Sequence, residues 1–591
     1  AAPRGRILDR NGNVLADSGP AWRVRIDRRI PAARRADLLR RLSPVLGIPV
    51  SDLTARMKDP SVARAAPATL LDDAPDEVVL ALRERAGEFP GIEVDSHPIR
   101  RYPHGSLAAH VLGVLGGAPG PGRAGRPGAS GVEAACDSVL AGRPGEERIE
   151  VDSAGRPVRT LSGSAAVPGH DVRLTVDLGV QAAAEQALAE GMAAARAGVP
   201  GAGGTAAPGG AVVAVDVRDG SIVALASAPT FDPAALAGRI PTAVWSALHD
   251  PAAHAPLTDR ALQGLYAPGS TFKPVTALAG LRAGLITPAT VVDDRGTYVL
   301  AGRTLRNAQN EAHGKVDLAR ALAVSSDVYF YGLGAKLYTG PPAGSPDGPI
   351  QDVAARLGFG RPTGIDIGPE AGGRLPGPSA RRAAHERSPQ ASPDPRWYLG
   401  DNVNLAIGQG SLLVTPLQLA DAYASLSTGL APPTPHVLSA PCGEAAGVAA
   451  RSGRAPAGFD AVALRAVQTG LLGAVGAKYG TASAAFAGFP LDRVPVEGKT
   501  GTAQVNGKAD TSLFAAAAPA NAPRYAVVAV VEEAGFGSAV AAPIVRRVLD
   551  ALLDLPAAPA AGLTALGAGP AGHRSPAGHP PVAAHHGAGR R

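Results

Sequence analysis

The chain of 591 residues is 45% hydrophobic and 18% charged, which is typical of a protein that folds into two to four globular domains with sizeable cores. Its formal net charge of +6 indicates a mildly basic surface, but no basic run is interleaved with aromatic residues, so nucleic-acid binding is excluded. The sequence has no C-x-x-C pair, which excludes a zinc ribbon, and no stretch of about 18 apolar residues that could cross a membrane.

The first region, residues 1–165, is rich in arginine and other polar residues. Short runs at 21–26 and 148–151 predict strands, and a loop rich in glycine, proline and arginine interrupts the region at 116–128. Composition therefore separates this region from the more apolar chain that follows.

The second region, residues 166–555, carries the stronger periodic patterns. Two apolar runs joined through Asp219-Gly220 predict a hairpin of residues 211–216 and 221–226. Other patterns predict strands at 171–177 and 524–532 and helices at 178–195 and 541–552. Strands at both ends with helices between them predict an α+β fold with an antiparallel sheet.

The third region, residues 556–591, consists mainly of alanine, proline, glycine and histidine without periodicity, which predicts a disordered tail. We interpret its four histidines as solvated tail residues rather than metal ligands: His573, His579, His585 and His586.

One segment contains a candidate nucleophile and a candidate base. Ser270 and Lys273 form an S-x-x-K, and the following residues predict a helix in which Pro274 is tolerated only in the first turn. A serine hydroxyl needs a neighbouring base, and a lysine amine at a helix N-terminus can have its pKa lowered enough to serve. The chain has only seven lysines and is otherwise arginine-biased, so a lysine at this place is informative, because arginine cannot act as a base.

Two further segments could complete such a site. Ser325 and Asp327 form an S-x-D after a helix-like run at 318–323, and a hydroxyl there could relay a proton to a leaving group. Lys499, Thr500 and Gly501 form the single K-T-G, within a strand-like run at 493–505. S-x-x-K and S-x-D are weak patterns alone and K-T-G is a stronger one. In this order they match the set S-x-x-K, S-D-N and K-T-G that penicillin-binding proteins and class A β-lactamases share, with Asp327 in place of the asparagine.

The K-T-G strand suggests how a substrate could be held. Lys499 with the hydroxyls of Thr500 and Thr502 would bind a carboxylate, and Gly501 would let a substrate backbone come close. The backbone N–H groups of Ser270 and Thr502 would form an oxyanion hole. A phosphate-binding loop is the competing reading, but no G-x-x-x-x-G-K precedes this lysine.

Beyond these three patterns, the chain resembles the class B penicillin-binding proteins from residue 4 to about 552. The residues that carry the resemblance are Arg4-Gly5-Arg6-Ile7-Leu8-Asp9-Arg10-Asn11-Gly12, Arg101-Tyr102-Pro103, Gly113, Gly131-Val132-Glu133, Leu140-Ala141-Gly142, residues 257–260, Gly408-Gln409-Gly410 and Thr415-Pro416-Leu417-Gln418. The resemblance implies a non-catalytic pedestal (dimerisation) domain at 1–165 and a transpeptidase domain at 166–555, which the predicted disordered tail at 556–591 follows.

The same resemblance implies a serine D,D-transpeptidase that cross-links peptidoglycan through an acyl-serine and is acylated by β-lactams. The expected ligands are the stem pentapeptide and β-lactams, the expected partner is a SEDS-family membrane glycosyltransferase, and no cofactor is expected. Because the chain starts at Ala1 and enters a motif at once, we expect a single-pass membrane anchor upstream and an extracytoplasmic catalytic domain.

The second motif departs from the usual S-x-N of the family. Asp327 replaces the asparagine, and its charge near Lys273 should raise the pKa of that lysine. Elongation-type members resemble the chain in this respect, so we expect a role in cell elongation and cell shape. Some of them bind zinc near this motif; Asp293, Asp294 and His313 are close in sequence but no cysteine is, so no metal is predicted.

Several alternatives stay open at this stage. A septal transpeptidase, a β-lactam sensor and a β-lactamase would share parts of the motif set, although a β-lactamase would be about half as long. Cys136 and Cys442 could form a disulfide, but nothing in the sequence decides whether they pair. The acceptor amine and the oligomeric state are also undetermined.

Overall fold

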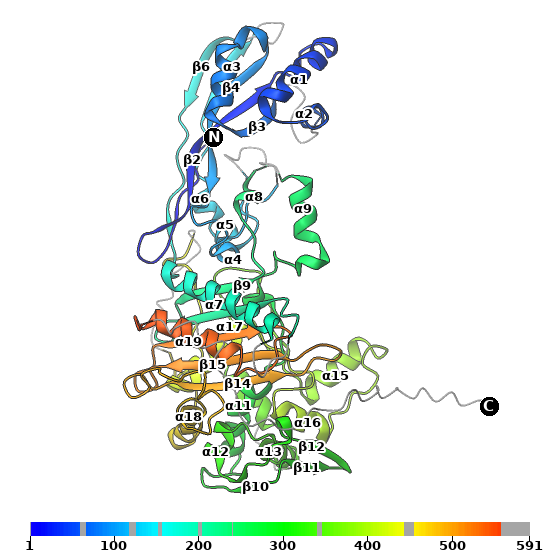
Figure 1. Cartoon of the computed structure of the whole chain (residues 1–591), viewed down its shortest axis with the longest axis vertical. Helices are drawn as coiled ribbons and strands as arrows, with labels where there is room; N and C mark the ends of the chain where they lie inside the picture. The colour runs from blue at the N-terminus through cyan, green and yellow to red at the C-terminus, as the bar shows by residue number, and fades with distance from the viewer. Residues whose placement is uncertain are drawn as a thin grey trace, which may run out of the picture.

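The computed structural model describes residues 2–58, 67–117, 126–151, 157–198, 204–238, 240–339, 346–442 and 454–556. Figure 1 shows an elongated molecule with the N-terminal elements at one end and, at the other, a larger body of helices around an antiparallel sheet, called the α/β body below. The predicted α+β fold is therefore confirmed. The predicted tail and most of the predicted 116–128 loop lie outside the described residues.

The N-terminal pedestal is built on a five-stranded sheet in the order β3-β2-β1-β7, with β4 also paired to β2. Its strands are β1 (Ile7–Leu8), β2 (Val14–Ile26), β3 (Ala68–Ala74), β4 (Ile92–Arg101) and β7 (Val172–Arg173). At the far end a small separate core, which includes Leu38, Leu42 and Leu53, packs α1 (Ala32–Leu46), α2 (Val50–Met57) and α3 (Asp76–Glu84) against this sheet. The short η1 (Ala86–Glu88) follows α3 and has no buried residue. A two-stranded ribbon of β5 (Glu146–Val151) and β6 (Pro157–Ser164) runs along the pedestal (Figure 1).

The part of the pedestal nearest the α/β body contains α4 (Ala109–Leu112), α5 (Gly131–Ala135) and α6 (Asp137–Leu140), held by buried charges. The fully buried carboxylate of Glu133 accepts hydrogen bonds from the guanidinium groups of Arg4 at 2.5 Å and Arg100 at 2.6 Å. Removing one partner of a buried ion pair leaves an uncompensated charge, so these residues must be retained together. Arg4 and Glu133 belong to two motifs that are far apart in the sequence.

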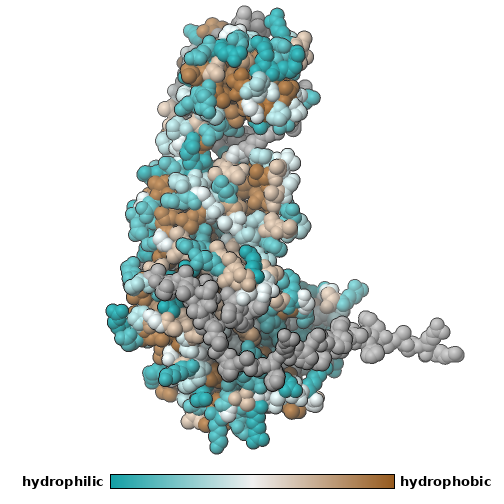
Figure 2. All heavy atoms as spheres, viewed as in Figure 1, coloured by the Kyte–Doolittle hydropathy of each residue, from teal (hydrophilic) through white to brown (hydrophobic). Residues whose placement is uncertain are grey.

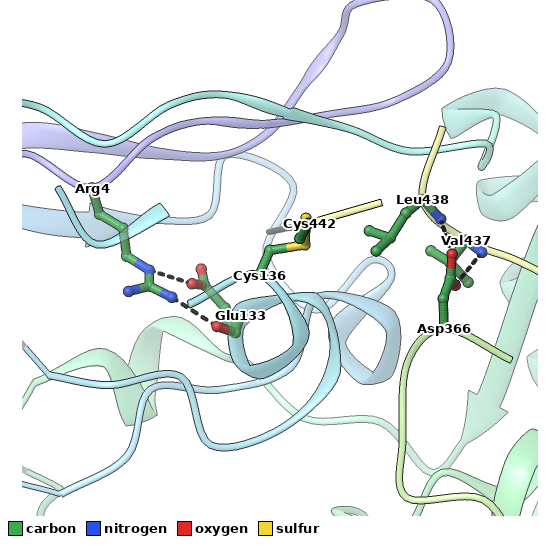
Figure 3. Close-up of a disulfide and its surroundings, with 7 residues drawn as sticks. All are labelled: Arg4, Glu133, Cys136, Asp366, Val437, Leu438 and Cys442. Atoms are coloured by element: carbon green, nitrogen blue, oxygen red, sulfur yellow. Dashed lines mark hydrogen bonds and ion pairs between the residues drawn. A yellow bond between two sulfur atoms is a disulfide. The ribbon is translucent and has the colours of Figure 1, made fainter. Parts of the chain in front are cut away.

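A disulfide joins the pedestal to the α/β body (Figure 3). Cys136, between α5 and α6, is bonded to Cys442, 306 residues away in the sequence. The segment before Cys442 is itself fixed, because the carboxylate of Asp366 accepts from the backbone N–H groups of Val437 at 2.7 Å and Leu438 at 3.1 Å. The question that the sequence left open is therefore resolved in favour of pairing.

The α/β body contains the predicted antiparallel sheet, in the order β14-β15-β16-β8-β9. The predicted hairpin is confirmed as β8 (Gly210–Asp216) and β9 (Ile222–Ala228), and the predicted C-terminal strand is β16 (Tyr525–Val531). The two remaining strands are β14 (Glu497–Ala503) and β15 (Thr511–Ala518). β14 lies at the edge of the sheet.

Helices cover both faces of this sheet. Val213 and Val215 of β8 face a core shared with α11 (Lys273–Arg282) and α17 (Pro416–Thr428), while Val212 and Ala214 face the opposite core. That second core contains α7 (Leu178–Ala197) and α19 (Ala541–Leu552), which match the two predicted helices (Figure 1). Burial on both faces explains why these strands are apolar throughout rather than alternating.

Two helices lie beside the pedestal (Figure 1): α8 (Ala234–Ala237) and α9 (Thr242–His249), where Leu236 and Leu248 pack in one cluster with Ala109 of α4. The short η2 (Pro251–Ala253) follows α9. The remaining elements belong to the part of the chain built around the three-layer core: α10 (Arg260–Gln263), η3 (Gly269–Phe272), β10 (Val292–Asp294), β11 (Thr297–Leu300), β12 (Arg303–Arg306), η4 (Ala308–Asn310), β13 (Gly314–Val316), α12 (Leu318–Ala323), α13 (Asp327–Thr339), α14 (Pro349–Arg356), α15 (Pro378–Arg387), α16 (Leu399–Ala406) and α18 (Ala461–Gly476).

The strand predicted at 171–177 is shorter than expected. Only Val172–Arg173 pairs as a strand, because Leu174 forms a single bridge with Leu438 and Asp177 already caps α7 by accepting from the N–H groups of Gly179 and Val180. In the view of Figure 2, hydrophobic residues form separate patches on both the pedestal and the α/β body, with hydrophilic residues between them. Within the described ranges, every helix is too short or too polar to span a bilayer.

Candidate active site

Ser270 lies on the short helical turn η3, directly before α11. The α-helix begins at Lys273, and Pro274 sits in its first turn, where the missing N–H costs no hydrogen bond. The prediction of a helix N-terminus is thus right, although the serine precedes the α-helix by one 3₁₀ turn. Gly269 has φ 52° and donates its N–H to the carbonyl of Gly408 at 2.9 Å, which connects the serine turn to the Gly408-Gln409-Gly410 loop.

The Lys273 amine is completely buried and contacts the second motif. Its Nζ donates to the carbonyl oxygen of Ser325 at 2.6 Å and to the Ser325 Oγ at 3.1 Å, and pairs with the Asp327 carboxylate at 2.7 Å. Within the described part of the chain, the Ser270 hydroxyl makes no hydrogen bond, so the expected contact between Ser270 and Lys273 is not formed. Such catalytic contacts often tighten only when substrate binds.

Two opposing influences act on the Lys273 amine. Burial is the larger, and it lowers the pKa of Lys273 because a buried cation loses its hydration. The carboxylate of Asp327, and more weakly that of Asp294, raise the pKa. The predicted effect of Asp327 therefore has the right sign, but the net pKa of Lys273 is lowered because burial outweighs it.

The K-T-G segment forms β14, paired in register with β15 so that Lys499 lies opposite Ala515 and Thr502 opposite Ser512. Position 501 must be a glycine because the turn that carries Ser270 packs closely against it. A Cβ at this position would lie 2.8 Å from the Thr271 Cγ2 and 2.9 Å from the Pro268 carbonyl oxygen. The close approach that we predicted at Gly501 therefore involves the protein's own chain.

The side chain of Lys499 is buried beneath the cavity surface and does not line the cavity. Its side chain is fully buried, and its Nζ donates to the carbonyl oxygen of Thr500 at 3.1 Å. Burial, reinforced by the charge of Lys273, holds the pKa of Lys499 well below its usual value, while Asp327 opposes this. Thr500 and Thr502 line the cavity, whereas Lys499 does not.

The three motifs line one cavity of about 550 Å³. Ser270 from the first motif, Ser325 and Asp327 from the second, and Thr500 and Thr502 from the third all face it. Segments that are up to 232 residues apart in sequence, from 270 to 502, thus meet at one place.

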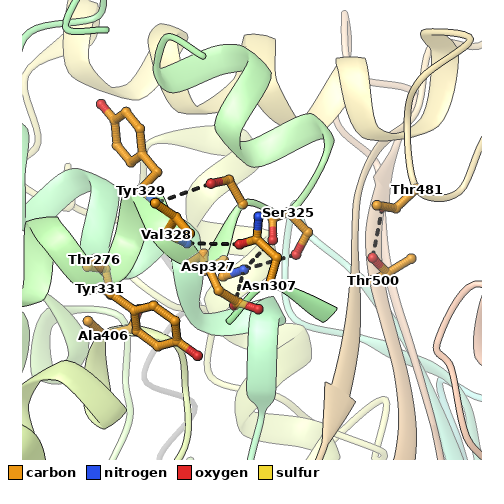
Figure 4. Close-up of polar contacts among 12 residues, drawn as sticks. Thr276, Asn307, Ser325, Asp327, Val328, Tyr329, Tyr331, Ala406, Thr481 and Thr500 are labelled. Atoms are coloured by element: carbon orange, nitrogen blue, oxygen red, sulfur yellow. Dashed lines mark hydrogen bonds and ion pairs between the residues drawn. The ribbon is translucent and has the colours of Figure 1, made fainter. Parts of the chain in front are cut away.

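Other cavity residues were not predicted to be part of the site. Thr481 accepts a hydrogen bond from the Thr500 hydroxyl at 2.8 Å (Figure 4), and no sequence pattern marked it. Gln409 could have been found, because it lies in one of the motifs that carried the family resemblance. The remaining lining residues are Arg306, Asn307, Ala308, Gln309, Glu311, His313, Val324, Tyr331, Ile407, Gln504, Asp510, Phe536 and Ser538.

The acidic residues near the second motif are used in protein contacts. Asp293 pairs with Arg295 at 2.7 Å, and the buried Asp294 accepts from Asn307 and Ser326. Across the residues that the structure describes, no group of three or more His, Cys, Asp or Glu side chains is arranged to hold a metal ion.

Two family models match the chain. The penicillin-binding protein transpeptidase domain matches residues 210–550, and the penicillin-binding protein dimerisation domain matches residues 1–174. The peptidoglycan D,D-transpeptidase MrdA of Acinetobacter baumannii is 29% identical over 93% of this chain and 80% of its own length.

Solved structures show the same relationship. A chain from a peptidoglycan synthase complex that coordinates polymerization and crosslinking is 31% identical, with a TM-score of 0.72 over 95% of this chain and 92% of that one. The penicillin-binding protein PBP2 of Helicobacter pylori, solved with MreC, has the same fold, with a TM-score of 0.77 and 23% identity over 94% and 98% of the two chains. These matches, together with the cavity in which the three motifs meet, show that the chain belongs to the class B penicillin-binding proteins.

Proposed function

We propose that this protein is a serine D,D-transpeptidase that cross-links peptidoglycan stem peptides through an acyl-enzyme on Ser270. The observation that supports this most directly is the meeting of Ser270, Ser325 and Thr502 in one cavity, with the buried amine of Lys273 behind them. The similarity to MrdA proteins, which are D,D-transpeptidases by name, supports the same reaction.

In the proposed first half-reaction, Lys273 acts as the base. Its lowered pKa favours the free amine, which accepts the proton of the Ser270 hydroxyl as the Oγ attacks the carbonyl carbon of the penultimate D-alanine. The backbone N–H groups of Ser270 and Thr502 stabilise the developing oxyanion. The C–N bond then breaks, and terminal D-alanine leaves with a proton relayed through the Ser325 hydroxyl.

In the second half-reaction an amine from a neighbouring stem peptide attacks the acyl-serine. The new C–N bond forms as the C–O bond to Ser270 breaks, and the amine's proton returns by way of Ser325 and Lys273 to the serine oxygen. Thr500 and Thr502 bind the substrate carboxylate in front of the buried Lys499, and Asp327 orients Lys273. Because β14 is the edge strand, a stem peptide can lie beside it. No cofactor takes part.

The proposed biological setting follows the relatives. The second motif is of the elongation type, so we assign the protein to cell elongation and cell shape rather than to septation. The synthase complex of the 31%-identical relative supports a partner that polymerises peptidoglycan, and we propose that this partner is a SEDS-family glycosyltransferase. A membrane anchor outside this chain would hold the catalytic domain on the extracytoplasmic side.

We divide the chain into a pedestal at 1–165, a transpeptidase domain at 166–555 and a tail at 556–591. The strand β7 lies after the first of these boundaries but still pairs with β1 of the pedestal.

The test is labelling of purified protein with a fluorescent penicillin, read by gel and by intact mass. Wild type should gain one penicillin adduct, Ser270→Ala should gain none, and Ser439→Ala, at an exposed serine outside the cavity, should label like wild type. An adduct that persists in Ser270→Ala would refute the assignment.

The same samples distinguish the alternatives. Rapid turnover of nitrocefin would indicate a β-lactamase. Acylation without release of D-alanine from a D-Ala-D-Ala substrate analogue would indicate a β-lactam sensor. Release of D-alanine together with formation of a cross-linked product is the result expected for a transpeptidase.

A further inference from the structure

The second motif has a backbone conformation that needs external support. Ser325 adopts φ 61°, in the left-handed region that residues other than glycine rarely occupy. Both its carbonyl oxygen and its Oγ accept hydrogen bonds from the Lys273 Nζ. The position of the amine in the site therefore depends on whatever keeps Ser325 in this conformation.

The residues directly after Ser325 are held by side chains from an earlier segment. The Ser326 Oγ donates to the Asp294 carboxylate at 2.5 Å and accepts from the N–H of Tyr329 at 3.1 Å. The Asn307 Oδ1 accepts from the N–H of Val328 at 3.0 Å (Figure 4). These amides belong to the first turn of α13 and have no partner within the helix, so Ser326 and Asn307 cap it.

The two supporting side chains also hold each other. The Asn307 Nδ2 donates to both oxygens of Asp294, at 2.8 and 2.9 Å, and to the carbonyl oxygen of Glu311 at 2.8 Å. The N–H of Gly296 donates to the Asp294 Oδ1 at 2.8 Å. Asp294 is completely buried and Asn307 is only 5% exposed, so water cannot readily replace these contacts.

We propose that Asn307 and Asp294 are positioning residues for the transpeptidase reaction: through Ser326 and the first turn of α13, they hold Ser325 against the Lys273 amine. The inference rests on the proposed function. Asn307 faces the cavity, but both ends of its amide are already bonded to protein, so its role is to place the second motif rather than to bind substrate. Asp294 and Ser326 do not line the cavity at all.

The test compares Asn307→Ala and Ser326→Ala with wild type, with Asn521→Ala as a control at an exposed asparagine in the turn between β15 and β16. Stopped-flow acylation by a fluorescent penicillin separates the dissociation constant of the initial complex from the acylation rate constant. We expect the rate constant to fall about 10- to 100-fold in both network variants, the dissociation constant to change by less than about threefold, and the control to match wild type.

A crystal structure of Asn307→Ala provides a readout that does not depend on activity. We expect Ser325 to leave its left-handed conformation and its oxygens to move away from the Lys273 Nζ. The proposal is overturned if the acylation rate constant stays within about twofold of wild type, if the rate constant and the melting temperature fall while the dissociation constant rises, or if the turn is unmoved in the crystal. Failure of wild type to be acylated would instead refute the proposed function, and the crystal structure would still decide the positioning role.

Discussion

The two sides of the cavity are held in place by different means. On one side, which we call the strand side, β14 is paired with β15 along its whole length, from Glu497 opposite Ala517 to Ala503 opposite Thr511. On the other side, which we call the turn side, the second motif lies in the turn between α12 and α13 and is held by the side chains of Asp294 and Asn307. Backbone pairing tolerates most side-chain changes, whereas a turn that depends on a few buried side chains does not.

This difference teaches where substitutions should matter. On the strand side, only groups that face the cavity or are buried with an uncompensated charge should be sensitive. On the turn side, residues that never contact substrate should be sensitive as well, because they control where Lys273 and Ser325 lie.

The largest effect is expected at the amine of Lys273, which the turn between α12 and α13 holds in position. Lys273→Met keeps the length of the side chain but removes the base, so acylation of Ser270 should slow by about 10³-fold, equivalent to roughly 4 kcal/mol. Labelling with a fluorescent penicillin measures this rate, and Lys336→Met at an exposed lysine of α13 is the matched control. Acylation within tenfold of wild type would show that Lys273 is not the base.

The next effect tests the strand side. Glu497, two residues before Lys499, is 3% exposed, and burial raises the pKa of its carboxyl from 4.5 to about 8. Its protonated form is favoured in the folded state, so its contribution to stability is complete below about pH 4.5 and is lost as the pH rises through about 8. In the Glu497→Gln variant, this loss of stability with rising pH should be absent.

Denaturant unfolding at pH 5 and pH 9 measures this contribution. Between these values, wild type should lose on the order of 3 kcal/mol more stability than Glu497→Gln. The exposed-site variant Glu386→Gln should behave like wild type. Parallel pH dependence of wild type and Glu497→Gln would mean that the carboxyl is hydrated in the folded protein.

The third prediction concerns the charge that opposes burial at Lys273. Because the Asp327 carboxylate raises the pKa of Lys273, Asp327→Asn should lower it and move the rising limb of the acylation pH profile to lower pH. Below the wild-type inflection, acylation should become a few-fold faster, provided the turn keeps its conformation. A profile from pH 5 to 9, compared with that of Asp293→Asn, checks this; a limb displaced to higher pH would contradict it.

The smallest effect is expected at Thr481, which supports the strand side through one hydroxyl. Thr481→Val removes the acceptor of the Thr500 hydroxyl, but Thr500 stays in place because β14 is fixed by its backbone. The cost should be at most about 1 kcal/mol, or a two- to fivefold slower acylation. Thr469→Val, at an exposed threonine of α18, is the control, and a loss above tenfold would show that the strand side also depends on single side chains.

Much of the fold could be predicted because its signals are local. The hairpin of β8 and β9, the helices α7 and α19 and the strand β16 follow from apolar runs and one Asp-Gly turn. The strand expected at 171–177 was too long, because its pairing is decided by Leu438, more than 260 residues away. Ser270, Lys273 and the K-T-G strand could be predicted as site residues because their spacing is short and their residue types are chemically restricted.

The supporting residues could not be found in this way. Asn307, Asp294 and Thr481 are ordinary residue types, and each becomes significant only through a partner brought near by the tertiary fold. The same holds for Cys136 and Cys442, whose pairing depends on how the pedestal meets the α/β body.

The sequence by itself determined which residues are candidates for the chemistry of this protein: a serine, a lysine three residues later, an S-x-D and a K-T-G can be recognised without coordinates, because each proposed role requires particular residue types at short spacing. Only the tertiary structure decided that the Lys273 amine donates to Ser325 rather than to Ser270, and that the Lys499 side chain is buried instead of lining the cavity. The physical reason is that burial and hydrogen bonding of an amine are set by neighbours far away in the chain, and no local pattern encodes them.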